Sequence, residues 1–225
     1  MKTVPATYIG DEQGRRSPGG RAETEAGGGS SPRRTEVRND MIETPNMIET
    51  PRLRLIACEL RHFEAILTDQ GRLGQMLGVT VPGDAFDFPG VMTIEAMRFM
   101  HEGLKADPGV IGWWTYLFVH AADGVLIGPG GYKGRADEEG AVEIGYAIVG
   151  KYRGQGLATE AARGLIDHAF SHEHVRRVDA HTLAEPNASV RVLEKAGMRF
   201  AGAVPDPDLG QVWRWSLHRA DHPRG

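Results

Sequence analysis

The sequence is poor in cysteine, since its 225 residues include only Cys58. A single thiol cannot form a disulfide within the chain, and a metal site built from cysteines is excluded. Long apolar runs are missing too. No segment approaches the roughly 18 apolar residues of a membrane-spanning helix, and the N-terminus has no apolar core of signal-peptide length. We therefore expect a cytoplasmic protein that binds no metal and enters no membrane.

Positive charge is also scarce. Lys and Arg number 26 against 30 Asp and Glu, which gives a formal net charge of −4 at pH 7. Proteins that bind nucleic acid normally present a positive field to the phosphates, so nucleic acid is excluded as the main partner. The content of hydrophobic residues, 40%, and of charged residues, 25%, is that of a globular protein. A chain of this length forms one domain with an appendage.

The first 46 residues differ in composition from the rest of the chain. They are rich in Gly, Arg, Glu, Ser and Pro and show no hydrophobic period. Such a segment buries too little apolar surface to offset its ordering entropy, so we predict a disordered extension over 1–46 and a folded domain over 47–225. The peptide MIETP occurs at Met41–Pro45 and again at Met47–Pro51. It is either a tandem binding motif or a local duplication ahead of the domain, and we favour the duplication.

The folded part alternates between strand and helix periods. The predicted strands are Arg52–Ala57, Trp113–His120, Gly124–Ile127, Ala141–Val149, Arg177–Thr182, Arg199–Ala203 and Gln211–Leu217. The predicted helices are Glu59–Leu77 (one helix or two short ones), Met92–Lys105, a segment ending at Phe170, and Asn187–Ala196. Pro129 and its neighbouring glycines predict that the second hairpin strand bulges or ends on an edge. This order of elements predicts a mixed α/β layer structure.

The stretch KYRGQGLATEAARGLIDHAF, Lys151–Phe170, follows a predicted strand and opens a predicted helix. The first turn of a helix presents unpaired N–H groups with partial positive charge, and glycines allow an anion to approach the backbone. A phosphate-binding P-loop needs Gly-Lys-Ser/Thr, which is missing, and a dinucleotide fingerprint needs glycine at Thr159. On this motif alone, a glycine turn without a ligand is an equally good interpretation.

The longer run VEIGYAIVGKYRGQGLATEAARGLI resembles the acetyl-coenzyme A motif of the GNAT superfamily of N-acetyltransferases, with Arg153-x-x-Gly156-x-Ala158 as its signature. The stretch AHTLAEPNASVRVLEKAGMRF and the closing VWRW are similar to the branch of ribosomal-protein N-terminal acetyltransferases, the RimJ/RimL-like branch. The resemblance covers roughly Thr50–Leu217. It implies a central, mostly antiparallel, splayed sheet of seven strands flanked by about four helices.

The same resemblance implies an enzyme that uses acetyl-coenzyme A as co-substrate. The acetyl group would pass directly, in a ternary complex, to a primary amine, which is a protein or peptide N-terminus or a small molecule. The amine itself is not encoded in a readable motif, and both a monomer and a homodimer remain open. The alternative function is a non-catalytic regulatory domain that binds acyl-coenzyme A.

The resemblance also implies which residues bind the cofactor. The loop backbone from Arg153 to Ala158 would hold the pyrophosphate, the preceding strand end would pair with the pantetheine arm, and Asn187 would bond that arm. A helix N-cap is the competing role for Asn187. The complete predicted set is Ile148, Val149, Arg153, Gly154, Gln155, Gly156, Leu157, Ala158, Thr159 and Asn187.

Two residues are predicted to act in catalysis. Glu143 aligns with a strand glutamate that some members of the superfamily use as the base, and Ser189 aligns with a serine proposed to protonate the departing thiolate. A solvated strand carboxylate and a helix cap are the competing roles. Many members carry a tyrosine where this chain has Leu193, which weakens the case for a dedicated acid.

Other reactive side chains are weaker candidates. Cys58 has no neighbouring histidine in the sequence, so we interpret it as a bystander thiol. His172 and His174 have crude metal-like spacing without a third ligand, which favours a solvated turn. The tryptophan pairs predict packing on the two faces of a sheet, with Trp113 or Trp114 available to line the acceptor cleft.

Overall fold

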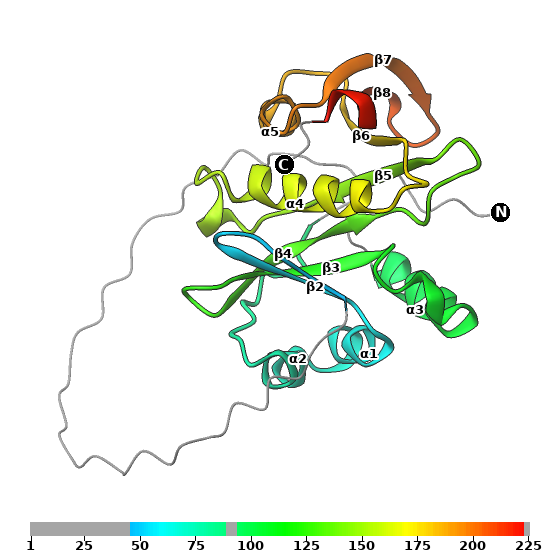
Figure 1. The fold of residues 1–225 in the computed structure, drawn as a ribbon. Coiled ribbons are helices and arrows are strands. Elements are labelled where there is room, and N and C mark those ends of the chain that lie inside the picture. The colour runs from blue at the N-terminus through cyan, green and yellow to red at the C-terminus, as the bar shows by residue number, and fades with distance from the viewer. Residues whose placement is uncertain (1–45, 89–93, 223–225) are drawn as a thin grey trace, which may run out of the picture.

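A computed structural model describes residues 46–88 and 94–222, so the predicted extension over 1–46 lies outside it except for Asn46. Over these residues the chain forms an eight-stranded sheet with helices on both faces (Figure 1). The order across the sheet is β1-β2-β3-β4-β5-β6-β8-β7, and only the β5–β6 pair is parallel. The strands are β1 (Met47–Glu49), β2 (Leu53–Ala57), β3 (Thr115–His120), β4 (Val125–Tyr132), β5 (Ala141–Tyr146), β6 (Arg177–Leu183), β7 (Arg199–Asp206) and β8 (Gly210–His218).

Five α-helices lie within the described residues. They are α1 (Leu60–Thr68), α2 (Gln70–Leu77), α3 (Ile94–Ala106), α4 (Leu157–Ser171) and α5 (Ala188–Lys195). None of these helices is both long and apolar enough to span a bilayer. The predicted fold class, a mixed α/β structure with a mostly antiparallel sheet, is confirmed.

The structure has one strand more than the sequence indicated, and it decides between the two alternatives for Glu59–Leu77. The extra strand is β1, which is formed by the second MIETP copy and pairs with β2. Three residues carry too little alternation to predict a strand, so its existence depends on that pairing. The segment Glu59–Leu77 forms two short helices, which is the second of the predicted alternatives. It divides at Asp69, which ends α1 and whose side chain accepts hydrogen bonds from Gly71 N and Arg72 N at the start of α2.

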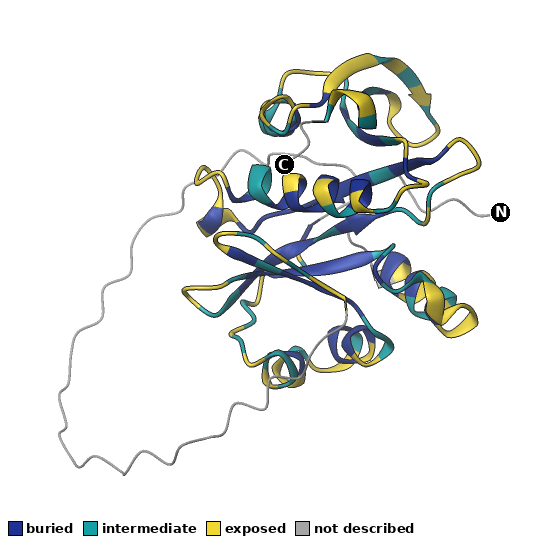
Figure 2. Ribbon diagram, in the orientation of Figure 1, coloured by how far each residue is buried: buried dark blue, intermediate teal, exposed yellow. Residues whose placement is uncertain are grey.

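Two hydrophobic cores flank the sheet. The first core lies between the sheet and the two helices α4 and α5. The second core lies on the other face, where α1, α2 and α3 pack against β2, β3 and β4. Figure 2 shows these central strands as the most deeply buried part of the fold. Within the described residues, the second core takes no side chain from β5, β6 or β8. The face of these three strands that points away from α4 is therefore outside both cores.

Glycines in β4 bring that strand unusually close to its neighbours. A Cβ at Gly128 would lie 2.1 Å from Ala147 O, and one at Gly131 would lie 2.0 Å from Trp114 O. The register with β3 shifts opposite Phe118 and Val119, which confirms the predicted bulge. The predicted alternative, an end on an edge, is wrong because β4 runs through Pro129 as a central strand.

The parallel pair β5–β6 separates part of the way along its length. Paired residues run only from Ala141 with Arg177 to Glu143 with Asp179. Beyond this point β6 stays paired with β8 to Leu183, whereas the chain after β5 stays with β4 through Ala147 N to Pro129 O, 2.8 Å. Each strand follows its other neighbour, so a gap opens between them. We call the point at Glu143 and Asp179 the fork.

Candidate functional site

The glycine loop enters α4 without a side-chain cap. Gly154 and Gly156 have φ of 74° and 80°, a left-handed conformation that L-residues with a side chain rarely adopt. Gly156 is the N-cap of α4 and has no side chain that could accept from the first-turn N–H groups of Leu157, Ala158 and Thr159. The loop from Arg153 to Gly156 is exposed. An anion that reaches this end of α4 meets backbone donors and the positive end of the helix dipole.

A polar network ties the loop to the β1–β2 turn. The Glu160 carboxylate accepts from Thr50 Oγ1, from Arg52 N and from Arg52 Nε, each at 2.7 Å. Arg52 also donates to Gln155 O at 3.0 Å. Burial alone would raise the pKa of the Glu160 carboxyl, but the hydrogen bonds from Thr50 and Arg52 outweigh it, and this pKa is lowered. The network therefore holds the first turn of α4, and with it the loop, in one position.

The strand end before the loop offers backbone groups to the gap. Ala147 N and Val149 N donate to β4, so by alternation the N–H and C=O of Ile148 point to the opposite side, into the gap. Arg153 Nε donates to Ile148 O at 2.8 Å. The predicted cofactor residues Ile148 and Arg153 therefore contact each other at the mouth of the gap.

Glu143 lies at the fork and is not a free carboxylate. Its Oε1 accepts from His181 Nδ1 of β6 at 2.9 Å and is ion-paired with Lys133, the residue after β4. All three side chains are partly exposed, with 24% for Glu143, 20% for His181 and 18% for Lys133. Val142 and Ile144 pack in the core under α4, so the intervening Glu143 points to the opposite face of the sheet.

The partners of Glu143 change its basicity. Burial alone would raise the pKa of the carboxyl, but the hydrogen bond from His181 and the charge of Lys133 outweigh it, and this pKa is lowered. Sequence reasoning missed both partners. No local pattern marks them, because Lys133 and His181 come from other strands and meet Glu143 only through the sheet register.

The predicted residues on α5 lie on the other side of the sheet. Asn187 is the N-cap of α5, where its Oδ1 accepts from Val190 N and its Nδ2 donates to Glu185 O, both at 3.1 Å. Ser189 is buried in the first turn of the same helix. Leu193 is fully buried in the core with α4, so the position of the family tyrosine is part of the packing here.

The weaker candidates have structural surroundings. Cys58 is buried, and burial followed by the charge of Glu59 raises the pKa of its thiol far above the ordinary range. His172 lies with His174 against the ring of Trp113, at ring separations of 4.8 and 5.9 Å. No group of three or more metal-binding side chains occurs within residues 46–88 and 94–222. Trp114 packs on the opposite side, against α3, so the predicted division between two faces is confirmed for Trp113 and Trp114. It is wrong for Trp213 and Trp215, which are two residues apart in β8 and both pack against the first core.

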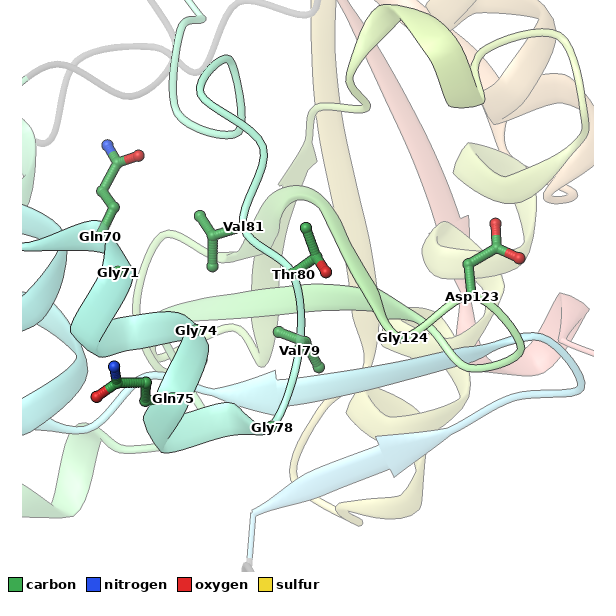
Figure 3. A pocket seen from close by; sticks show the side chains of 10 residues that line it. All are labelled: Gln70, Gly71, Gly74, Gln75, Gly78, Val79, Thr80, Val81, Asp123 and Gly124. Atoms are coloured by element: carbon green, nitrogen blue, oxygen red, sulfur yellow. The ribbon is translucent and has the colours of Figure 1, made fainter. Parts of the chain in front are cut away.

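A cavity of about 530 Å³ lies between α2 and the β3–β4 turn (Figure 3). Gln70, Gln75 and Thr80 supply its polar side chains, and Asp123 with Gly124 closes it on the other side. Asp123 also accepts from Tyr152 OH at 2.7 Å, directly before the glycine loop. The cavity therefore lies at the same end of the sheet as the glycine loop.

Comparison with known proteins agrees with this architecture. The sequence model of the acetyltransferase (GNAT) domain matches residues 52–199. The uncharacterized N-acetyltransferase YjdG of Bacillus subtilis (strain 168) is 30% identical over 151 residues, which cover 67% of this chain and 88% of that protein. RimJ of Mycobacterium smegmatis, solved in complex with CoA-disulfide, aligns with a TM-score of 0.57 at 20% identity over 80% of this chain and 91% of that chain. The ribosomal-protein-S5-alanine acetyltransferase from Vibrio fischeri aligns with a TM-score of 0.56 at 15% identity, over 79% of this chain and 99% of that chain. At these identities the two solved structures establish the shared fold.

Proposed function

The chain belongs to the GNAT acetyltransferase family, and from this premise we propose that it transfers the acetyl group of acetyl-coenzyme A directly to a primary amine. The observation that supports this most is the gap between β5 and β6, which opens at Glu143 and leads to the uncapped N-terminus of α4. One end of this gap suits a pyrophosphate, and the other end carries ionisable side chains. A bound thioester would lie between them.

The proposed cofactor path starts at the glycine loop. The N–H groups of Leu157, Ala158 and Thr159 would bind the pyrophosphate, since an anion is stabilised at a helix N-terminus. The pantetheine arm would run along Ile148 as an added strand, with Asn187 of α5 on its other side. From Val149 back to Glu143 the strand spans about 20 Å at ~3.3 Å per residue, which is of the order of an extended pantetheine arm.

The proposed chemistry takes place at the fork. A neutral amine attacks the thioester carbon, a base near Glu143 removes the proton from nitrogen, and the thiolate leaves. Ser189 is the proposed proton donor to the thiolate. It lies in the first turn of α5, where the helix dipole favours a developing negative charge.

The charges around the fork favour one class of acceptor. Lys133 and Arg214 place two cations on the same face as Glu143, and Arg214 is the register partner of His181. Glu143 and Asp179 on this face are already paired with Lys133 and Arg177, so the face has no excess of carboxylates that would attract a polycationic amine. An α-amino group, with a pKa of about 8, is partly neutral near pH 7.5 and needs only a moderate base. We therefore propose the N-terminal amine of a peptide or protein as the acceptor, with small monoamines as the second candidate.

A thiol-release assay tests this function. Purified protein with acetyl-coenzyme A is offered peptides with different N-terminal residues, monoamines and a polycationic amine, and mass spectrometry locates the acetyl group. We expect release of coenzyme A with N-terminally acetylated peptide and little or none with the polycation. Tight cofactor binding by calorimetry without turnover on any amine would instead support a regulatory acyl-coenzyme A-binding domain.

A further inference from the structure

We propose that His181, and not the Glu143 carboxylate, accepts the proton of the attacking amine, while Glu143 holds the imidazole in position. This role rests on the proposed transfer to an amine. Its starting point is the contact of His181 Nδ1 with Glu143 Oε1 at 2.9 Å.

The position of His181 places its ring beside the gap. Asp179 is the last residue of β6 that pairs with β5, and His181 lies two residues further along on the same face. Its side chain therefore extends from the edge of the gap, whereas Glu143 belongs to the last closed pair. A substrate that enters between the strands meets the imidazole beyond the carboxylate.

The contact with Glu143 also selects a tautomer of the imidazole. A carboxylate accepts hydrogen bonds, so Nδ1 carries the proton and Nε2 keeps a lone pair. This is the arrangement in which a carboxylate orients a histidine that acts as a base. Lys133 contacts the same Oε1 and keeps the carboxylate ionised, which makes Glu143 a good anchor. The lowered pKa of Glu143 makes it a weaker base toward an amine.

Charged groups of both signs surround His181. On its own face it meets Glu143 from β5, Lys133 beside β4 and the register partner Arg214 from β8. Asp179, two residues earlier on β6, is already bound by Arg177 at 3.0 Å and by Ser216 Oγ at 2.6 Å. His181 therefore has one carboxylate partner, Glu143, and two cations on its face, Lys133 and Arg214.

Bonds and protons balance in this transfer. The amine nitrogen forms a bond to the thioester carbon, and the proton leaving nitrogen goes to His181 Nε2. The C–S bond breaks, and its electron pair leaves on sulfur. The thiolate takes a proton from Ser189 or from the imidazolium, which gives the amide, coenzyme A thiol and a neutral His181.

The test compares pH profiles of kcat and kcat/KM for the wild type, His181→Gln, Glu143→Gln and the double variant. His218→Gln serves as the matched control, because His218 is an exposed histidine at the far end of β8. We expect His181→Gln to lower kcat about 10²–10⁴-fold at pH 7 and to lose the pH-dependent limb assigned to the base, with acetyl-coenzyme A affinity within about twofold. The double variant should be no slower than His181→Gln, because the two residues act as one unit.

Two outcomes of the turnover measurements would overturn the proposal. If His181→Gln keeps near wild-type turnover while Glu143→Gln loses it, the carboxylate is the base. If both variants keep wild-type turnover, water is the base. Nitrogen-15 NMR of the folded wild type with coenzyme A bound removes any dependence on variant folding. We expect the Nδ1–H tautomer for His181, and the Nε2–H tautomer would contradict the proposal.

Failure of the proposed function would be seen separately. If no amine in the panel is acetylated, slow hydrolysis of acetyl-coenzyme A by water replaces transfer as the readout. A base at the fork should accelerate that reaction too, so His181→Gln should slow it while His218→Gln should not. Equal hydrolysis by all variants would refute a basic role for His181 whatever the acceptor.

Discussion

Replacing Gly156 tests the cofactor site most directly. Gly156 is the N-cap of α4 with φ 80° and ψ 2°, and a Cβ built there has only Arg52 Nη2 nearby, at 3.6 Å. The left-handed backbone costs a residue with a side chain about 1–2 kcal/mol. Since the space is open, Gly156→Ala and Gly156→Glu should both fold, with a melting temperature lower by about 2–8 °C.

The effect on acetyl-coenzyme A should be larger in the charged variant. The carboxylate introduced by Gly156→Glu would stand in front of the first-turn N–H groups and repel the pyrophosphate. Loss of two charge-assisted hydrogen bonds, at about 1.5–3 kcal/mol each, corresponds to about 10²–10⁴-fold weaker binding. Gly156→Ala removes no donor and adds no charge, so we expect a loss of about tenfold or less.

Isothermal titration calorimetry with acetyl-coenzyme A gives the dissociation constants, and a thermal melt of each variant reports its folding. Gly78→Glu is the matched control. Gly78 has φ 64° and no atom within 4 Å of an added Cβ, so it carries the same backbone strain. It ends α2 and is not part of the glycine loop. If the Gly156→Glu variant folds and still binds acetyl-coenzyme A with wild-type affinity, the anion site lies elsewhere.

Three further perturbations probe the fold around the site. Glu160→Ala leaves three donors from Thr50 and Arg52 without their acceptor, so the free energy of unfolding should fall by about 1–3 kcal/mol. Calorimetry should also show weaker acetyl-coenzyme A binding. Unchanged binding would show that this network does not position the loop. Gly131→Ala forces a Cβ against Trp114 O at a backbone φ of 138°. Denaturant unfolding should show that the free energy of unfolding falls by about 3 kcal/mol or more. A fall below about 1 kcal/mol would contradict that close approach. Burial, with a smaller effect of a neighbouring imidazole, lowers the pKa of His168 to about 4, while an unfolded histidine has a pKa of about 6.5. Between these values the unfolded state binds more protons, so stability should fall with falling pH by at most about 1.4 kcal/mol per unit, and His168→Gln should flatten this slope in denaturant titrations at pH 7 and pH 4.5.

Local features of the chain were readable from the sequence. Alternating and helical periods predicted most strands and helices, because each depends on which side of one segment is apolar. The glycine loop was readable for the same reason, since Gly154 and Gly156 adopt backbone conformations that few other residues tolerate. The family resemblance then connected this loop to acetyl-coenzyme A.

Features that depend on pairing between distant segments were not readable. The strand β1 exists because β2 accepts it as a neighbour, and β4 continues past Pro129 because its glycines let the adjacent backbones approach. In both cases the deciding contacts come from other parts of the chain.

The same distinction between local and long-range features applies to the candidate site. The sequence alone determined that a glycine turn opens α4, because that property belongs to one turn of backbone. Only the tertiary structure decided what surrounds Glu143. Lys133, Glu143 and His181 meet because three strands align in register and two of them then separate, and no single segment carries that information.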